Sequence, residues 1–194
     1  LADAPAFSDL RHPAPLVETD DSADASTVLA FVQLRVPLRR PAVYALSWRA
    51  GRDSVVRDVN PLPTQWEPDA PGAFLPMVLI HGSGGGRWYN LTEWHWWSQG
   101  PEYRHLLVDG THEPLAMYML NPEHAQSTAM VELRNSRNVD IYSIKAEGNY
   151  TVLWMRGCRG VRLFGYGGNG SPWRDWAMVR IDDSQDVMLA NIAP

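Results

Sequence analysis

One segment of the sequence, residues 130–192, repeats the same pattern three times. In each copy a short apolar run leads to a small residue, and a second, alternating run follows it. The small residues are Ser136, Cys158 and Ser184, which are separated by 22 and 26 residues. A repeat of this length with two strands per copy is typical of a solenoid, because one unit buries its apolar face only against stacked neighbours.

The repeat predicts an all-β fold, a right-handed parallel β-helix of about six coils. Weaker copies precede the clear ones, at 43–59, 77–89 and 106–119. The right hand follows from the chirality of parallel crossover connections. Three interior columns are expected: Leu133, Met155 and Ile181; Val139, Val161 and Val187; Ile141, Leu163 and Leu189. An antiparallel β-sandwich is the alternative, since short strands separated by regular turns fit it as well.

The length of 194 residues predicts one main domain, preceded by a segment of different composition. Residues 1–27 are rich in Ala, Pro and Asp and predict an acidic, weakly structured lead or a strap along the solenoid flank. Residues 28–194 are expected to form the β-helix. No signal peptide is visible, and the last repeat has no capping element. We therefore expect a fragment, or an additional chain that caps the C-terminal rung.

Charge and apolar patterning exclude two classes of partner. The formal net charge is -5, and no Lys/Arg cluster exceeds Arg39-Arg40, which argues against nucleic acid. No apolar run approaches the roughly 18 residues that a transmembrane helix requires, so no membrane partner is expected. The single cysteine, Cys158, falls in the small-residue column and is expected to be a buried, inert thiol.

Large aromatic residues gather in one insertion after the glycine run 84–86. Indole and phenol rings beside carboxylates suit a sugar-binding groove, because the apolar faces of pyranose rings stack on them. The alternative is an aromatic lid that covers one side of the solenoid without any ligand. The candidate substrate-binding residues are Trp88, Tyr89, Trp94, Trp96 and Trp97.

Acidic and basic residues concentrate between residues 93 and 149. A hydrolase needs two carboxyl groups about 5–9 Å apart, which neighbouring rungs can supply. A polysaccharide lyase needs a base beside groups that neutralise a uronate carboxylate. The candidate catalytic residues are His112, Glu113, Glu123, His124, Glu132 and Lys145.

The sequence shows no metal motif. The two His-Glu neighbours lack the HExxH spacing, and no third ligand is placed by sequence. The glycine run lacks the Lys-Ser/Thr pair of a phosphate loop. No metal and no cofactor are therefore expected; a calcium ion is compatible with the sequence but is not indicated by it.

The pattern of strand, small residue and strand in Leu133–Ile144, Met155–Tyr166 and Ile181–Ile192 resembles the pectate-lyase-like superfamily of right-handed parallel β-helix proteins. That group contains polysaccharide lyases and polygalacturonase-like glycoside hydrolases. The resemblance is to an architecture, and the sequence matches neither the paired aspartates of the hydrolases nor the calcium-binding aspartates of the lyases. It implies a polysaccharide as the partner, by analogy only.

Two functions are therefore expected as alternatives. The first is a carbohydrate-active enzyme, a lyase or a hydrolase, that is secreted or held at the cell surface. The second is a non-catalytic solenoid module for carbohydrate binding or surface assembly, such as a piece of a spike or an adhesin. An enzyme requires at least two of the candidate acid/base residues to converge beside Trp88 or Trp94.

Overall fold

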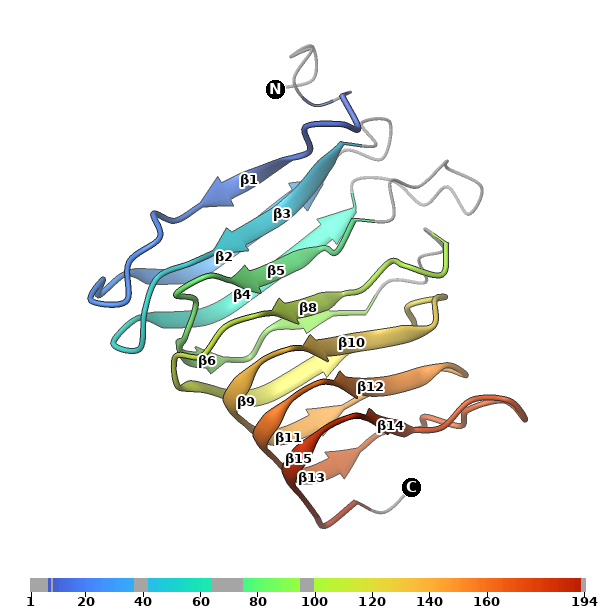
Figure 1. Ribbon diagram of the computed structural model, residues 1–194. Helices are drawn as coiled ribbons and strands as arrows, with labels where there is room; N and C mark the ends of the chain where they lie inside the picture. The colour runs from blue at the N-terminus through green and yellow to red at the C-terminus, as the bar shows by residue number, and fades with distance from the viewer. Residues whose placement is uncertain (1–6, 8, 37–41, 64–74, 95–99, 193–194) are drawn as a thin grey trace.

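The chain folds as an all-β parallel solenoid of about six turns, seen in a computed structural model. The structure describes residue 7 and residues 9–36, 42–63, 75–94 and 100–192. Figure 1 shows two layers of parallel strands, stacked from the N-terminal rung to the C-terminal rung. The predicted parallel β-helix architecture is confirmed, and the antiparallel sandwich is wrong, because every strand pairing is parallel within the described residues.

The two sheets take alternate strands of the chain. The first sheet contains, in spatial order, β1 (Ala14–Glu18), β3 (Val43–Trp48), β5 (Val78–His81), β8 (Leu106–Asp109), β10 (Ala129–Arg134), β12 (Thr151–Arg156) and β14 (Val179–Asp182). The second contains β2 (Val28–Val36), β4 (Val55–Pro63), β6 (Gly86–Tyr89), β9 (Leu115–Pro122), β11 (Arg137–Lys145), β13 (Arg159–Gly167) and β15 (Gln185–Ala190). A short strand, β7 (Thr92–Glu93), pairs with the end of β9.

The predicted interior columns are present in the strand register. Leu133 pairs with Met155, and Met155 pairs with Ile181. The other two columns are confirmed in the same way in β11, β13 and β15. Leu133 and Met155 are 0% exposed, whereas Ile181 in the last rung is 42% exposed. Burial of these columns therefore supplies the core, and it declines where stacking partners end.

The corner between the two sheets contains the predicted column of small residues. Ser136 donates a hydrogen bond to the carbonyl of Arg134 (2.8 Å), and Ser184 Oγ accepts one from the backbone N–H of Cys158 (3.0 Å). Cys158 is buried, and burial raises the pKa of its thiol. The prediction of a buried thiol is confirmed, and a thiol with a raised pKa is a poor nucleophile.

Each rung has a residue with positive φ at one equivalent position, within or directly after its second-sheet strand. The values of φ lie between 49° and 85°. A residue in this left-handed region turns the strand, which is why Asn, Asp and Gly are frequent there. The bend residues are Phe31, Asp58, Asn90, Met119, Ser143, Gly165 and Asn191. Beyond this position the chain forms a separate short ladder, in which Thr92 and Glu93 pair with Asn121 and Pro122, and we call this the third side of the solenoid.

An aromatic column lies on the outer surface of the second sheet, directly before the bend. Tyr89 stacks on Tyr118, Tyr118 on Tyr142, and Tyr142 on Phe164, with ring centroids 4.9, 4.9 and 5.3 Å apart. The rings are within 12° of parallel. The spacing follows the distance between strands, so each ring packs its faces against the rings above and below.

Part of the N-terminal segment, for which a weakly structured lead or a strap along the solenoid flank is expected, forms a strand. Residues 14–18 form strand β1, which pairs in parallel with β3 from Ala14 to Glu18. Ser22 and Ala50 form a further isolated parallel bridge. The first sheet therefore begins within residues 1–27, before the expected boundary at residue 28.

The described part of the chain contains no helix that is long and apolar enough to cross a membrane.

Candidate functional site

Four charged or titratable side chains converge where the third side of the solenoid meets the first sheet. Glu123 and His124 directly follow β9, and Lys145 and Glu147 stand at the end of β11, one rung further on. The Lys145 ammonium donates hydrogen bonds to Oε1 of Glu123 and to Oε1 of Glu147, the latter at 3.0 Å. The hydrogen bonds to Glu123 and Glu147 raise the pKa of Lys145 and keep it protonated. We call these four residues the Glu123–Glu147 cluster.

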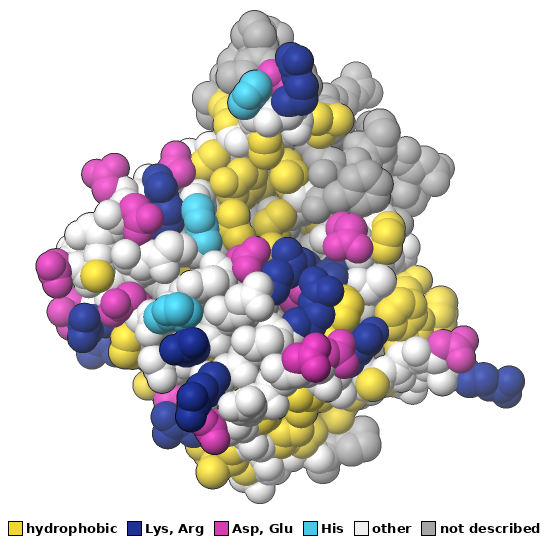
Figure 2. Space-filling view, in the orientation of Figure 1, with side chains coloured by type: hydrophobic (Ala, Val, Ile, Leu, Met, Phe, Trp, Pro, Cys, Tyr) yellow, Lys and Arg dark blue, Asp and Glu magenta, His cyan; other side chains and the backbone are white. Residues whose placement is uncertain are grey.

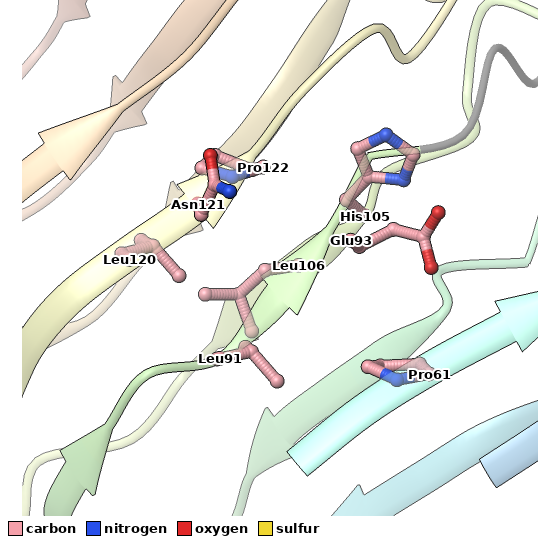
Figure 3. A pocket seen from close by; sticks show the side chains of 8 residues that line it. All are labelled: Pro61, Leu91, Glu93, His105, Leu106, Leu120, Asn121 and Pro122. Atoms are coloured by element: carbon pink, nitrogen blue, oxygen red, sulfur yellow. The ribbon is translucent and has the colours of Figure 1, made fainter. Parts of the chain in front are cut away.

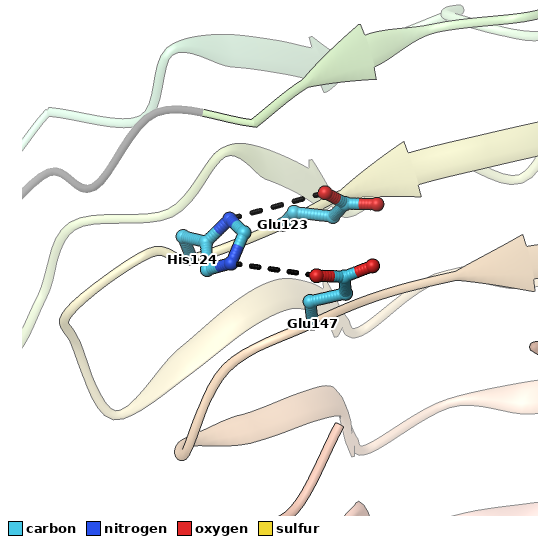
Figure 4. A group of neighbouring side chains, drawn as sticks. All are labelled: Glu123, His124 and Glu147. Carbon is cyan, nitrogen blue, oxygen red and sulfur yellow. Dashed lines mark ion pairs between the residues drawn. The ribbon is translucent and has the colours of Figure 1, made fainter. Parts of the chain in front are cut away.

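His124 faces the oxygens of the two carboxylates that Lys145 does not contact. Its Nδ1 lies 3.9 Å from Oε2 of Glu123, and its Nε2 lies 3.8 Å from Oε2 of Glu147. Figure 4 shows the imidazole ring beside the two carboxylates, with one ring nitrogen directed toward each. The two Oε1 atoms thus face a cation, and the two Oε2 atoms face an imidazole.

The backbone holds this cluster in place. The N–H of His124 donates to the carbonyl of Glu147 (2.9 Å), which ties the two rungs together. His124 itself has φ of 65°, a left-handed conformation that histidine adopts more readily than most residues.

Trp94 borders the cluster. His124 Nδ1 donates a hydrogen bond to the Trp94 carbonyl oxygen (3.2 Å), so this nitrogen carries a proton. The Trp94 side chain is 52% exposed. Of the five candidate aromatic residues, Trp94 therefore combines an exposed side chain with a backbone contact to the cluster.

A buried polar chain supports Glu123 from inside the solenoid. The Tyr103 hydroxyl donates to Nδ1 of His105 (2.7 Å), and Nε2 of His105 donates to the Glu123 carbonyl oxygen (2.7 Å). Burial raises the pKa of Tyr103 well above its ordinary value, so the hydroxyl keeps its proton as a donor. The Glu123 N–H donates to the Glu93 carbonyl at 2.7 Å. These contacts fix the turn that carries Glu123 and His124.

A small cavity lies beneath the same turn (Figure 3). It lies between the two sheets, and most of its wall is apolar. His105 and Glu93 contribute to it, next to the end of β9. The lining residues are Pro61, Leu91, Glu93, His105, Leu106, Leu120, Asn121 and Pro122. Because the cavity is small and interior, we do not assign a polysaccharide to it.

Two of the predicted catalytic residues lie at the opposite end of β9. His112 is exposed at the corner before this strand, and its carbonyl accepts a hydrogen bond from Asn138 (3.1 Å). Glu113 forms an ion pair with Arg52 (3.2 Å). The structure therefore separates this pair from Glu123, His124 and Lys145, which it brings together.

Glu132 does not belong to a reactive site. Its side chain is 0% exposed and is held by Arg104 (2.8 Å), Arg134 (3.0 Å) and Arg156 (2.7 Å). Figure 2 shows arginine and lysine side chains gathered near the middle of the first sheet's outer face, with acidic side chains among them. The prediction of a catalytic Glu132 is wrong, because the arginines cover both carboxylate oxygens and exclude a substrate.

Burial of Glu132 opposes its ionisation. The hydrogen bond from Arg134 and the charge of Arg104 outweigh this effect, and they hold the pKa of Glu132 below its usual value. Glu132 is therefore the ionised centre of a buried ion-pair network.

Trp88 is also not a ligand-stacking residue. It is 1% exposed and packs edge-on against Trp48, with ring centroids 5.5 Å apart. Both indole N–H groups donate to the carbonyl of Gly85. The prediction of substrate binding is wrong for Trp88, since the ring is part of the core. Tyr89 belongs to the stacked column, and Trp96 and Trp97 lie outside the described residues.

Glu147 is the member of the cluster that the sequence analysis did not select. It follows Glu123 by 24 residues, within the 22–26-residue spacing of the repeat. The spacing was therefore the signal that could have found it, because residues one period apart stand on neighbouring rungs.

Comparison of the chain with protein-family models, with curated proteins and with solved structures found no match. The structure supports the architectural part of the predicted resemblance, the parallel solenoid.

Proposed function

We propose that this chain is a carbohydrate-active solenoid that hydrolyses glycosidic bonds at the Glu123–Glu147 cluster. One observation carries the proposal: two carboxyl groups, an imidazole and an ammonium group converge next to the backbone of Trp94, a residue whose indole is exposed. This is the convergence that an enzyme of this architecture requires. The resemblance to the pectate-lyase-like superfamily adds carbohydrate as the substrate class, by analogy.

The spacing of the two carboxyl groups supports hydrolysis. Glu123 and Glu147 offer oxygen atoms within 4.8 Å of each other. Retaining glycosidases place their two carboxyl groups about 5–5.5 Å apart, one as nucleophile and one as acid/base. Trp94, whose carbonyl accepts a hydrogen bond from His124, offers an exposed indole for stacking against a sugar ring.

The charge of the cluster favours a neutral polysaccharide over a uronate. Two carboxylates and one ammonium group leave a net charge of about -1 when His124 is neutral. The carboxylate of a uronic acid would meet like charge within a few ångströms, which disfavours its binding. Elimination by a lyase is therefore the less favoured reaction. A polysaccharide substrate also implies action outside the cell or at its surface.

A panel of neutral and anionic polysaccharides tests this proposal. Production of reducing ends reports hydrolysis, and ultraviolet absorbance of unsaturated products reports elimination. We expect reducing ends from a neutral polymer, and a loss of at least about 100-fold in kcat for Glu123→Gln and Glu147→Gln. Glu113→Gln is the matched control, since this carboxylate stands at the far end of β9, and it should keep full activity. Equal activity of Glu123→Gln and wild type would refute the assignment.

One observation favours the non-catalytic alternative. Lys145 pairs with both carboxylates, so its ammonium group occupies one oxygen of each. A pair of carboxyl groups that cleaves a glycosidic bond must instead be open to the sugar. Absence of turnover on the whole panel, with binding that Trp94→Ala abolishes, would establish a carbohydrate-binding module instead.

A further inference from the structure

We infer that Glu123, His124 and Glu147 form a binding site for a divalent transition-metal ion, with Zn²⁺ as the fitting probe. One ligand atom from each of these residues lies within 4.8 Å of the other two. The site shares its residues with the proposed hydrolytic cluster, but metal binding does not depend on turnover of a carbohydrate.

The distances fit ligands of a common ion better than direct hydrogen bonds. Nε2 of His124 and Oε2 of Glu147 are 3.8 Å apart, beyond the length of a hydrogen bond. Two ligand atoms that each lie about 2.1 Å from one ion are about 3.4 Å apart at a tetrahedral angle. An inward shift of a few tenths of an ångström would therefore place these two atoms on one ion. The Glu123 oxygen, which lies within 4.8 Å of the other ligand atoms, would move inward by up to about 1.4 Å to reach the same ion.

A hydrogen bond to a residue outside the cluster determines the tautomer of His124. Nδ1 donates its proton to the carbonyl of Trp94, a residue of the preceding rung. In the neutral ring the lone pair is then on Nε2, the nitrogen that faces Glu147. Metal-binding histidines usually donate their other N–H to a carbonyl or carboxylate, and this bond fixes the ring orientation.

Lys145 contacts one oxygen of each carboxylate, and the other oxygen of each is directed toward the proposed ion. Its ammonium group lies next to Oε1 of Glu123 and Oε1 of Glu147, while the Oε2 atoms face His124. The ammonium and the metal ion would thus contact different oxygens of the same two carboxylates. They repel each other across this short distance, so Lys145 lowers the metal affinity.

The ligand set selects the kind of ion. One imidazole nitrogen and two carboxylate oxygens suit Zn²⁺ and related transition metals. Ca²⁺ takes six to eight oxygen ligands, and the side chains of this site offer fewer. We therefore expect Zn²⁺ to bind and Ca²⁺ not to compete with it.

Isothermal titration of the full chain with ZnCl₂ tests the inference. We expect one Zn²⁺ per chain at this site. Loss of a residue that hydrogen-bonds a metal ligand typically weakens metal affinity by about 10–100-fold. His124→Asn removes a ligand itself, so it should weaken the Zn²⁺ affinity of the site by at least this much. Asparagine is chosen since it tolerates the positive φ of residue 124. His112→Asn, at the exposed corner before β9, is the matched control and should leave the affinity unchanged.

Two further variants should change the Zn²⁺ affinity in opposite directions, which adventitious binding would not do. Glu147→Gln should weaken Zn²⁺ binding as His124→Asn does, whereas Lys145→Gln should strengthen it by about fivefold to tenfold. Equal affinity of wild type and His124→Asn, weaker binding by Lys145→Gln, or displacement of Zn²⁺ by equimolar Ca²⁺ would each overturn the site. Because the readout is heat of metal binding, failure of the polysaccharide assay leaves it unaffected. Failure to bind Zn²⁺ likewise leaves the hydrolysis proposal standing.

Discussion

Met155→Asp is expected to unfold the solenoid. Met155 is fully buried between Leu133 and Ile181 in an interior column, so an aspartate there has neither water nor a cation beside it. An unpaired buried carboxylate costs several kcal/mol, and the lost burial of the methionine adds about 2–3 kcal/mol. The sum is comparable with the whole stability of a typical domain, about 5–15 kcal/mol. Circular dichroism and urea denaturation would show the loss of the folded state.

Ile181→Asp is the matched control, because it occupies the same column one rung later. Ile181 is 42% exposed, so an aspartate there can reach water and is expected to reduce stability by only about 1–2 kcal/mol. A folded Met155→Asp protein with near wild-type stability would contradict the assignment of this column to the core.

Glu132→Gln is expected to be the second most damaging change. The substitution keeps the shape of the side chain but removes the negative charge that Arg104, Arg134 and Arg156 share. Arg104 is 1% exposed and would be left as a buried cation without its counter-ion. Breaking a buried ion pair from one side typically costs about 3–5 kcal/mol, which urea denaturation at neutral pH would measure.

Asp186→Asn is the control for this variant. Asp186 pairs with Arg159 at 2.9 Å, but both side chains are exposed, and such pairs contribute about 0–1 kcal/mol. A comparable loss in the two variants would show that the buried network is not special.

The stabilisation by Glu132 should also depend on pH in one direction. The pKa of Glu132 is lowered in the folded state, so its contribution is fully present above the ordinary glutamate pKa of about 4.3. It is lost as pH falls through the lower pKa of the folded protein, where the carboxyl becomes protonated. The difference in stability between wild type and Glu132→Gln should therefore shrink in acid.

The strand register could be predicted from the sequence because the repeat is chemically simple. Leu133, Met155 and Ile181 occupy equivalent places in three copies, and alternation in a strand fixes which side they face. The small residues were also predictable, since a tight corner admits little else. The entry of residues 14–18 into the first sheet was not, because its composition resembles that of a weakly structured segment.

The site was only partly predictable, because the sequence of a strand does not show which of its outward side chains are covered by other segments. Alternation places Glu132 outward, between the inward Val131 and Leu133. An outward residue is normally solvated, but here Arg104, from the segment before β8, lies over it. Nothing within one strand tells which outward positions another segment covers. The prediction for Trp88 assumed an outward-facing ring, whereas the ring points inward and packs against Trp48.

The stacked column of Tyr89, Tyr118, Tyr142 and Phe164 has a consequence for how the molecule comes apart. Each ring touches only the rung above and the rung below, so the couplings form a one-dimensional chain. Removing the ring of Tyr118 deletes two couplings, whereas removing that of Phe164 deletes one. A break in the middle would leave two shorter stacks, each able to lose its outermost rung next. Amide exchange should therefore be slowest in the central rungs and fastest in the terminal ones.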